Sequence, residues 1–422
     1  MSRIRIIITI IVVVLTTLLT GCTGKEPNEI AYVVALGIDS TDDDNYKITI
    51  QYANTTQISG GASESGGKAG SEIVDNVTIE APNIYAGVGL ANNIVSKSFS
   101  MSHAKLIVFS KEIAEKGVKD MIETLVRSEE IRPDVFIAVA NTTANDYLTS
   151  VNPEMEVNPA QYYQLIYQKN QLVGIPDGQL REFFTGLYTD NYDSILPVAG
   201  VIEGAGGNSQ NDDKGQSKDG QNEGSEGSSE SLDSFESKSS DDKDENEKEK
   251  DAEKNTSKYE YDIKNYVGGE TAIEKKNKAE AIGAAVFEKD KMVGELGEVE
   301  TEICKILKGD YTYSYLTYYN NDTPDIPITV KTTQQKKPKY KIDTDKKTVD
   351  IELYIESDLY SLPADYNVEN KIEDFERDVA NYTSSACTEF INNFTKKYNS
   401  DILKLNEKVK YKFLTNNQYN WF

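Results

Sequence analysis

The sequence from Gly204 to Ser257 cannot contribute to a hydrophobic core. It consists almost entirely of Gly, Ser, Asn, Asp, Glu and Lys, and Leu232 and Phe235 are nearly its only large apolar residues. A segment of this composition buries too little apolar surface to offset the entropy that it would lose on ordering. We therefore expect a disordered acidic insert at 204–257, a solvated spacer in preference to an acidic binding arm, and a fold built from the sequence on either side.

The first 22 residues have the layout of a bacterial secretory signal. Arg3 and Arg5 form a basic start, an apolar run extends from Ile6 to Leu19, and the run ends in Leu19-Thr20-Gly21-Cys22. The run is short for a membrane-spanning helix, and small residues at its end are typical of a cleavage site. The final motif resembles a lipobox, in which the cysteine receives a diacylglyceryl group and becomes the new N-terminus. We predict that 1–21 is a signal peptide and that Cys22 is the lipid attachment site, the alternative being an uncleaved anchor helix with an incidental cysteine. Either way, the remaining chain is expected to act at a membrane surface on the extracytoplasmic side.

Charge and cysteine content narrow the classes of partner and cofactor. The chain carries 70 acidic and 45 basic side chains, a formal net charge of −25. This balance argues against nucleic acid, since phosphate binding needs clustered Lys and Arg, and against electrostatic attachment to anionic lipid. Cys304 and Cys387 are far apart in sequence and lie in apolar helical patterns, which predicts buried thiols and neither a disulfide framework nor a metal site. We expect no cofactor besides the diacylglyceryl and N-acyl lipid on Cys22.

Few residues suggest catalytic chemistry. His103 is the only histidine, which excludes Ser-His-Asp and Cys-His nucleophilic sites and zinc sites that need two imidazoles. We expect it to be a hydrogen-bonded structural residue, although Ser102-His103-Ala104-Lys105 also allows a relay. Gly87-Val88-Gly89 lacks the Lys-Ser/Thr of a phosphate loop, and Asp42-Asp43-Asp44 lacks the spacing of a calcium loop. We predict no catalytic residue and no metal site, while a two-carboxylate glycosidase and the position of any ligand-binding residue stay open.

The first half of the chain alternates predicted strands and helices. Ile30 to Asp39 is apolar on both faces, which predicts a buried strand, and Tyr46 to Tyr52 alternates as the return strand of a hairpin. Short apolar runs predict further strands at 105–109 and 135–140, and another short run extends over 194–202. Helical spacing predicts one helix from near Pro82, a second over 113–125, and tyrosine-rich helical pieces after Asn158.

The second half supports an α+β fold class, with mixed and antiparallel sheets covered by helices. The pattern predicts a hairpin at 282–296, a helix from 299 to 307, and a long amphipathic helix over 372–398. It also predicts a strand whose buried face is formed by Val349, Ile351, Leu353 and Ile355. We expect an N-terminal domain at 22–150, a middle domain at 151–203 and 258–320, and a C-terminal domain at 321–422.

Several motifs occur in an order that resembles the Ger(x)C lipoproteins. They are Glu29-Ile30 with Leu36-Gly37-Ile38-Asp39, Ser102-His103-Ala104-Lys105-Leu106-Ile107-Val108, Glu112-Ile113-Ala114 with Gly117, Arg127-Ser128-Glu129-Glu130-Ile131-Arg132, Ala285 to Gly294, Glu298 to Thr301, and Asn399 to Leu403. The resemblance covers nearly the whole chain apart from the insert. It departs from the family pattern at Thr23, where an aromatic residue is common, and after Tyr419-Asn420-Trp421-Phe422, where relatives continue into one more strand. We therefore expect a C-terminal sheet that lacks its last strand and has an unpaired edge.

The resemblance implies a receptor subunit. Ger(x)C proteins are the C subunits of spore nutrient-germinant receptors, held by lipid on the outer face of the spore inner membrane. They work with a larger A subunit and a transporter-like B subunit, and the complex responds to nutrients such as amino acids or sugars. We expect this chain to act in assembly or signalling and to have no enzymatic activity. The competing classes are a solute-binding lipoprotein of a transporter and, third, a hydrolase of the cell envelope.

Overall fold

The computed structural model describes residues 3–10, 29–43, 45–53, 74–153, 156, 158–168, 174–189, 192–202, 265–271, 277–318, 327–361 and 372–413. The predicted insert at 204–257 and the predicted lipid site at Cys22 lie outside these ranges. Residues 3–10 form an exposed helix. Within the described ranges, no helix combines the length and the apolar character that crossing a membrane requires.

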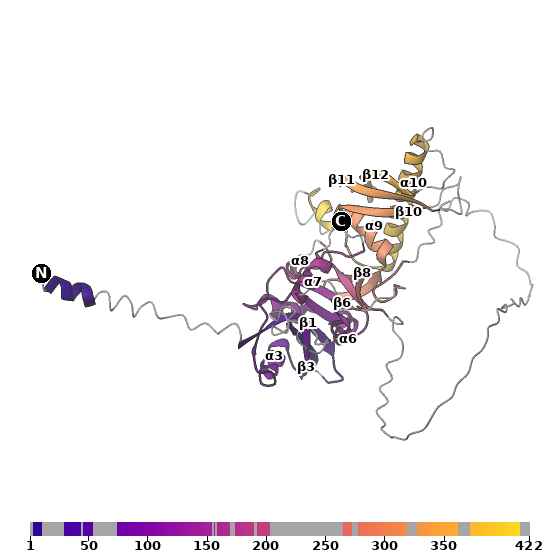
Figure 1. Cartoon of the computed structure of the whole chain (residues 1–422). Helices are drawn as coiled ribbons and strands as arrows, with labels where there is room; N and C mark the ends of the chain where they lie inside the picture. The colour runs from indigo at the N-terminus through magenta and orange to yellow at the C-terminus, as the bar shows by residue number, and fades with distance from the viewer. Residues whose placement is uncertain are drawn as a thin grey trace, which may run out of the picture.

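A single mixed sheet of nine strands organises most of the fold (Figure 1). Its strands are β1 (Ile30–Ser40), β2 (Tyr46–Ala53), β3 (Val74–Ala81), β4 (Ser98–Ser100), β5 (Leu106–Ser110), β6 (Phe136–Ala140), β7 (Ile195–Val201), β8 (Ala279–Glu288) and β9 (Lys291–Leu296). The order is β3-β2-β1-β5-β6-β7-β8-β9, with β4 paired to β1 off this path. The pairs from β1 through β5 and β6 to β7 are parallel, and antiparallel strands extend the sheet on both sides.

Helices cover both faces of this sheet, as buried parallel strands require. One face packs against α3 (Ile84–Ala91), α4 (Lys111–Lys116), α5 (Lys119–Val126) and α8 (Leu180–Tyr188). The other face packs against α6 (Ala144–Ser150) and α7 (Pro159–Tyr167). The predicted hairpin of β1 and β2 is confirmed by its antiparallel register, and the predicted α+β class is confirmed.

The helix predicted over 113–125 is wrong in one respect, because the structure has two helices there. Gly117 lies between α4 and α5 with a φ of 122°, a conformation that L-residues rarely adopt. The next amide, Val118 N–H, donates to the carbonyl of Asp290 at 3.0 Å, and Asp290 lies in the turn between β8 and β9. The hydrogen bond at this break therefore connects the helices α4 and α5 to the β8–β9 hairpin, which is far away in sequence.

The domain boundaries predicted at 150 and 320 do not separate the two sheets of the molecule. β6 precedes residue 150 and β7 follows it, yet the two strands pair in parallel. β7 is buried along most of its length and extends the same core. β10 (Tyr313–Tyr318) precedes residue 320 but pairs with β11 (Ile328–Asp343), which follows it. With β12 (Thr348–Ser361), these strands form the second sheet, in the order β10-β11-β12.

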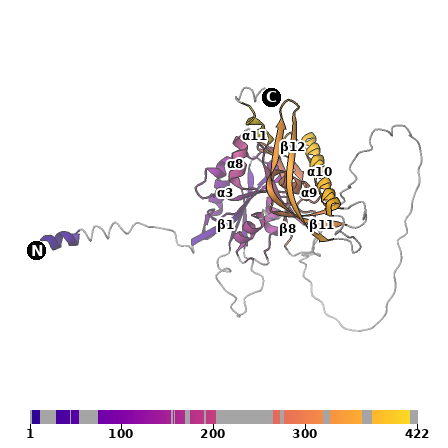
Figure 2. The same cartoon turned by 90° about the horizontal axis from the view of Figure 1, so that it is seen from above.

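The long helix α10 (Ile372–Lys397) connects the two sheets (Figure 2). Its first half packs Phe375, Val379 and Tyr382 into one cluster with side chains of β10 and β11. Its second half packs into another cluster with α9 (Glu298–Lys308) and with β8 and β9 of the main sheet. The short α11 (Leu405–Lys410) follows. Two different partners along one helix therefore hold the second sheet against the first.

The prediction that one face of β12 is buried is only partly correct. Val349, Ile351, Leu353 and Ile355 share a face, but all four are only half-buried. Together with α10 they line a cavity of about 1170 Å³. The reason is that α10 directs its largest buried side chains at β10, β11 and α9, and Ile372 at its start is 53% exposed.

One close approach of backbones makes a clear stability prediction. A Cβ on Gly200 in β7 would lie 2.0 Å from the carbonyl carbon of Gly268, and the three nearest atoms all belong to the backbone of Gly268 and Gly269, so no flexible side chain can move away. We expect Gly200→Ala to lower the free energy of unfolding by about 3 kcal/mol, the upper range for overpacking. Gly89→Ala is the control, because a Cβ there meets nothing within 4 Å. In this helix, alanine should raise the free energy of unfolding by about 0.5–1 kcal/mol. Urea unfolding measures both, and equal values for the two variants would contradict the packing argument.

Candidate functional site

The residues singled out by sequence lie apart in the structure. His103 is exposed, with its Nδ1 3.0 Å from the hydroxyl of Ser102 and its ring against Tyr32 at a centroid distance of 4.8 Å. It is hydrogen-bonded as predicted, although on the surface. Asp42 and Asp43 lie in the β1–β2 turn, and no group of three or more metal-ligating side chains occurs within the described residues.

Cys304 and Cys387 are both buried, as predicted. Cys304 on α9 and Cys387 on α10 belong to the same apolar cluster and are free thiols. Burial raises the pKa of Cys304 to about 11 and that of Cys387 to about 12. Each thiol therefore stays protonated and unreactive in the folded protein, because the thiolate is the nucleophilic form.

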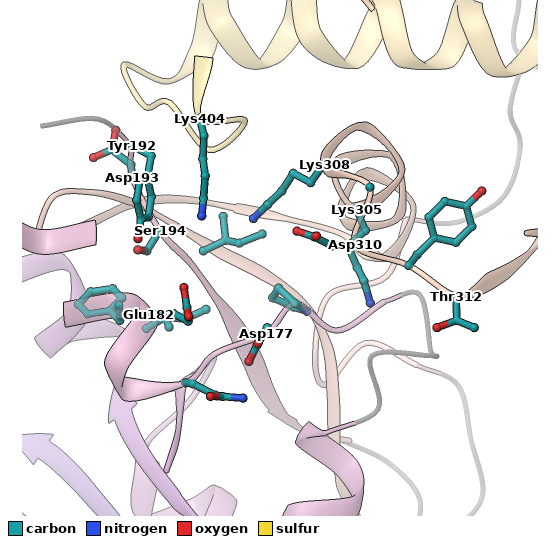
Figure 3. A pocket seen from close by; sticks show the side chains of 17 residues that line it. Asp177, Glu182, Tyr192, Asp193, Ser194, Lys305, Lys308, Asp310, Thr312 and Lys404 are labelled. Atoms are coloured by element: carbon teal, nitrogen blue, oxygen red, sulfur yellow. The ribbon is translucent and has the colours of Figure 1, made fainter. Parts of the chain in front are cut away.

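A cavity of about 450 Å³ lined by charged side chains lies where the main sheet meets the C-terminal elements (Figure 3). Its walls come from the 176–179 loop, α8, the start of β7, the end of α9 with the turn that follows it, and Lys404. Figure 3 shows ammonium and carboxylate groups converging on the same space. The lysines are Lys305, Lys308 and Lys404, and the carboxylates include Asp177, Glu182 and Asp310.

Two aspartates fix the C-terminal wall of the cavity. Asp193 accepts hydrogen bonds from the backbone N–H groups of Lys289 and Asp401, both at 2.9 Å. Asp401 in turn accepts the N–H groups of Leu405 at 2.8 Å and Asn406 at 2.7 Å, so it caps α11. Burial raises the pKa of Asp401, and these two backbone donors oppose that effect.

Lys404 lies on this wall, and its side chain points toward Tyr192 in the segment before β7. Its φ of 58° is left-handed, and its Nζ lies 4.1 Å from the centroid of the Tyr192 ring. This geometry is a cation–π contact between the turn before α11 and the segment before β7. The Lys404 side chain thereby lines the cavity, as Figure 3 shows.

Lys305 forms the deepest cationic part of the cavity. The side chain is buried on α9, and its Nζ donates to the carbonyl of Ile175 at 3.0 Å. Burial lowers the pKa of Lys305 to about 8, with Asp310 and Glu302 acting in the opposite direction. The hydrogen bond to this main-chain carbonyl therefore fixes the position of the ammonium. It places a positive charge in the wall of the cavity.

The cavity can hold a small polar molecule, since it offers charges of both signs. Gln179 also contributes a buried Oε1 that has no hydrogen-bond partner within the described residues. Burial raises the pKa of Asp177, which a backbone hydrogen bond from Gln179 partly offsets.

A buried acid lies on the same helix as Lys305 and Lys308. Glu302 is buried on α9 and accepts a hydrogen bond from the hydroxyl of Ser314 on β10. Burial raises its pKa to about 8, with Glu298 adding to the effect and Lys305 opposing it. This carboxyl links the main sheet's helix to the second sheet.

Sequence reasoning did not find this cavity. Its lining residues come from segments between 176 and 404 that only the fold brings together. One local signal was present, because Glu302 and Lys305 lie three residues apart within the predicted apolar helix. Charged residues at buried positions of an amphipathic helix point to a functional or linking site.

Comparison with known proteins identifies the family. The family model described as "Spore germination protein N-terminal domain" matches residues 24–201. The model described as "Spore germination B3/ GerAC like, C-terminal" matches residues 282–421. The two matches lie in order on either side of the predicted insert and together cover most of the chain. The chain therefore belongs to the Ger(x)C family of spore germination proteins, as the sequence motifs predicted.

Individual relatives are distant. The chain is 26% identical to spore germination protein KC of Bacillus subtilis (strain 168) over 176 residues, which is 38% of this chain and 43% of the relative. It is 28% identical to the putative spore germination protein YfkR of the same organism over 145 residues, 34% of this chain and 37% of the relative. The chain thus spans less than half the length of these curated relatives. The crystal structure of the GerBC protein aligns with a TM-score of 0.46 and 13% identity, covering 91% of this chain and 89% of that one.

Glu302 makes a pH-dependent stability prediction. Its pKa rises from an ordinary 4.5 to about 8 on folding, so the folded state holds a proton that the unfolded state releases between these values. Its contribution to stability therefore falls as pH rises through this window. We expect Glu302→Gln to raise the free energy of unfolding at pH 8 by about 2 kcal/mol, with little change near pH 4.5.

Urea unfolding across this pH range measures the effect. Glu376→Gln on the exposed side of α10 is the matched control and should give no pH-dependent difference. A Glu302→Gln variant that loses stability equally at every pH would show that the carboxyl is ionised in the folded protein.

Proposed function

We propose that this protein is the lipid-anchored C subunit of a spore nutrient-germinant receptor. The observation that carries the proposal is the order of features along the chain. A lipobox-like motif ends at Cys22, the first spore germination match begins directly after it at residue 24, and the second match follows from residue 282. In this proposal, the diacylglyceryl and N-acyl lipid on Cys22 holds the protein on the outer face of the spore inner membrane.

We infer that the protein acts by binding and has no catalytic turnover. The single histidine is exposed, both described cysteines are buried, and the charged cavity contains no histidine. The proposed partners are the A and B subunits of the receptor, which lie in the membrane. Within the complex, the protein serves assembly or signalling in nutrient-triggered germination.

The alternative of a solute-binding lipoprotein has less support. Proteins of that class have two similar lobes that close on a cleft. The part of the chain that the structure describes has one nine-stranded sheet and one three-stranded sheet, which are unlike each other. The charged cavity lies where the main sheet meets the C-terminal elements, which differs from a cleft between two similar lobes.

The receptor assignment predicts a spore phenotype. Spores that lack the gene should fail to respond to one class of nutrient and still germinate with non-nutrient triggers, because only the receptor step is lost. Pull-down from detergent-solubilised spore membranes should recover the A and B subunits with this protein. A normal response to all nutrients in spores without a paralogous subunit would contradict the assignment.

Lipidation of Cys22 is a separate prediction. Cys22→Ala should abolish labelling by a fatty-acid probe and leave unprocessed precursor, because the acceptor thiol is gone. Cys304→Ala is the matched control, since that thiol is buried in the fold, and it should label normally. Labelling that survives in Cys22→Ala would place the lipid elsewhere.

A further inference from the structure

The helix α3 exposes an apolar surface that the fold does not use. All eight residues of α3 are uncharged, from Ile84 to Ala91. Its inner side is buried, whereas Leu90 is 49% exposed and Tyr85 is 40% exposed. Ile94, in the turn that follows, is 68% exposed. A helix that is apolar all round is normally enclosed by protein or lipid, and this one lies on the surface of a chain with a net charge of −25.

This surface lies at the end of the protein where the chain leaves for its N-terminus. The turn after α3 leads directly into β4, and Ser98 of β4 pairs with Ile30, the first residue of β1. Asn92 holds the turn in place by accepting the backbone N–H of Phe99 at 2.7 Å. Figures 1 and 2 both show α3 beside the start of β1, on the side opposite to α10 and β12.

The length of the tether limits how far this end can be from the membrane. Cys22 and Ile30 are separated by eight Cα-to-Cα steps, which span at most about 28 Å when the chain is fully extended. Ile94 is four residues before Ser98, which pairs with Ile30. Nearly the same upper limit therefore applies to the distance between Cys22 and Ile94. The second sheet and α10 have no such constraint, because the whole main sheet lies between them and the tether.

We propose that Leu90 and Ile94 insert into the lipid interface of the membrane that holds the anchor. The proposal rests on the proposed function, because a lipid on Cys22 is what brings this end of the protein to the membrane. The contact is apolar and not electrostatic, since the chain's charge repels anionic lipid. Two protruding side chains suit shallow insertion among lipid headgroups. A protein partner would need a far broader surface, of about 800 Å² per side.

Site-selective fluorescence tests the insertion. The lipidated full chain carrying Ile94→Cys is labelled with an environment-sensitive fluorophore, which spares Cys304 and Cys387 because both are buried. The protein is reconstituted into phosphatidylcholine vesicles whose acyl chains carry a nitroxide quencher. The control is Tyr360→Cys, where Tyr360 is 56% exposed. It belongs to β12, the strand that Figures 1 and 2 show on the side opposite to α3.

We expect nitroxide lipid to quench the label at position 94 by about half and to leave the label at position 360 unchanged, in low and in high salt alike. Aqueous iodide should give the opposite ranking. A label at Leu90→Cys repeats the measurement at a second position. Iodide quenching at 94 as strong as at 360, without nitroxide quenching, would overturn the proposal.

Two further outcomes are informative. If the label at position 94 becomes shielded from iodide only when the membrane subunits are reconstituted with the protein, the surface binds protein and lipid insertion is wrong. Flotation of the vesicles is measured first on the same samples. Protein that fails to float has no lipid anchor, which counts against the proposed function and is distinguishable from a floating protein whose label stays in water.

Discussion

β1 lies in the middle of the large sheet, and its interactions position most of the surrounding elements. It pairs with β2 on one side and with β5 and β4 on the other, and it is buried along nearly its whole length. Near its end, Asp39 accepts the backbone N–H groups of Ala144 at 2.6 Å and Asn145 at 3.0 Å at the start of α6. Burial raises the pKa of Asp39, and these two donors offset part of that penalty.

The same strand sets how closely α6 can approach. A Cβ on Gly37 would lie 3.0 Å from the side chain of Leu148 and 3.1 Å from that of Ala144, so the absence of a side chain there lets the helix sit on the sheet. β1 is also the first strand of the described fold after the proposed anchor. It contributes side chains to the core on both faces of the sheet.

Local features of the fold were predictable from sequence, and long-range ones were not. The hairpin of β1 and β2 and that of β8 and β9 follow from alternation and a nearby turn, which are properties of a few consecutive residues. The break at Gly117 depends on Asp290, and the half-buried face of β12 depends on where α10 packs. The charged cavity depends on Asp193 and Asp401, which bond to each other's backbone across more than two hundred residues of sequence. Periodicity in one segment carries no information about such contacts.

The pairing of β7 with β8 has a practical consequence for work on the intact protein. Val201 lies opposite Ala279, and Ile202 N–H donates to the carbonyl of Lys278 at 2.9 Å, so the two ends of the long connection between these strands are neighbours. The entropy of closing such a connection grows only slowly with its length. We expect that a fluorescent domain or an affinity tag spliced between residues 204 and 257 would report on the protein in living spores and leave the sheet and the cavity unchanged.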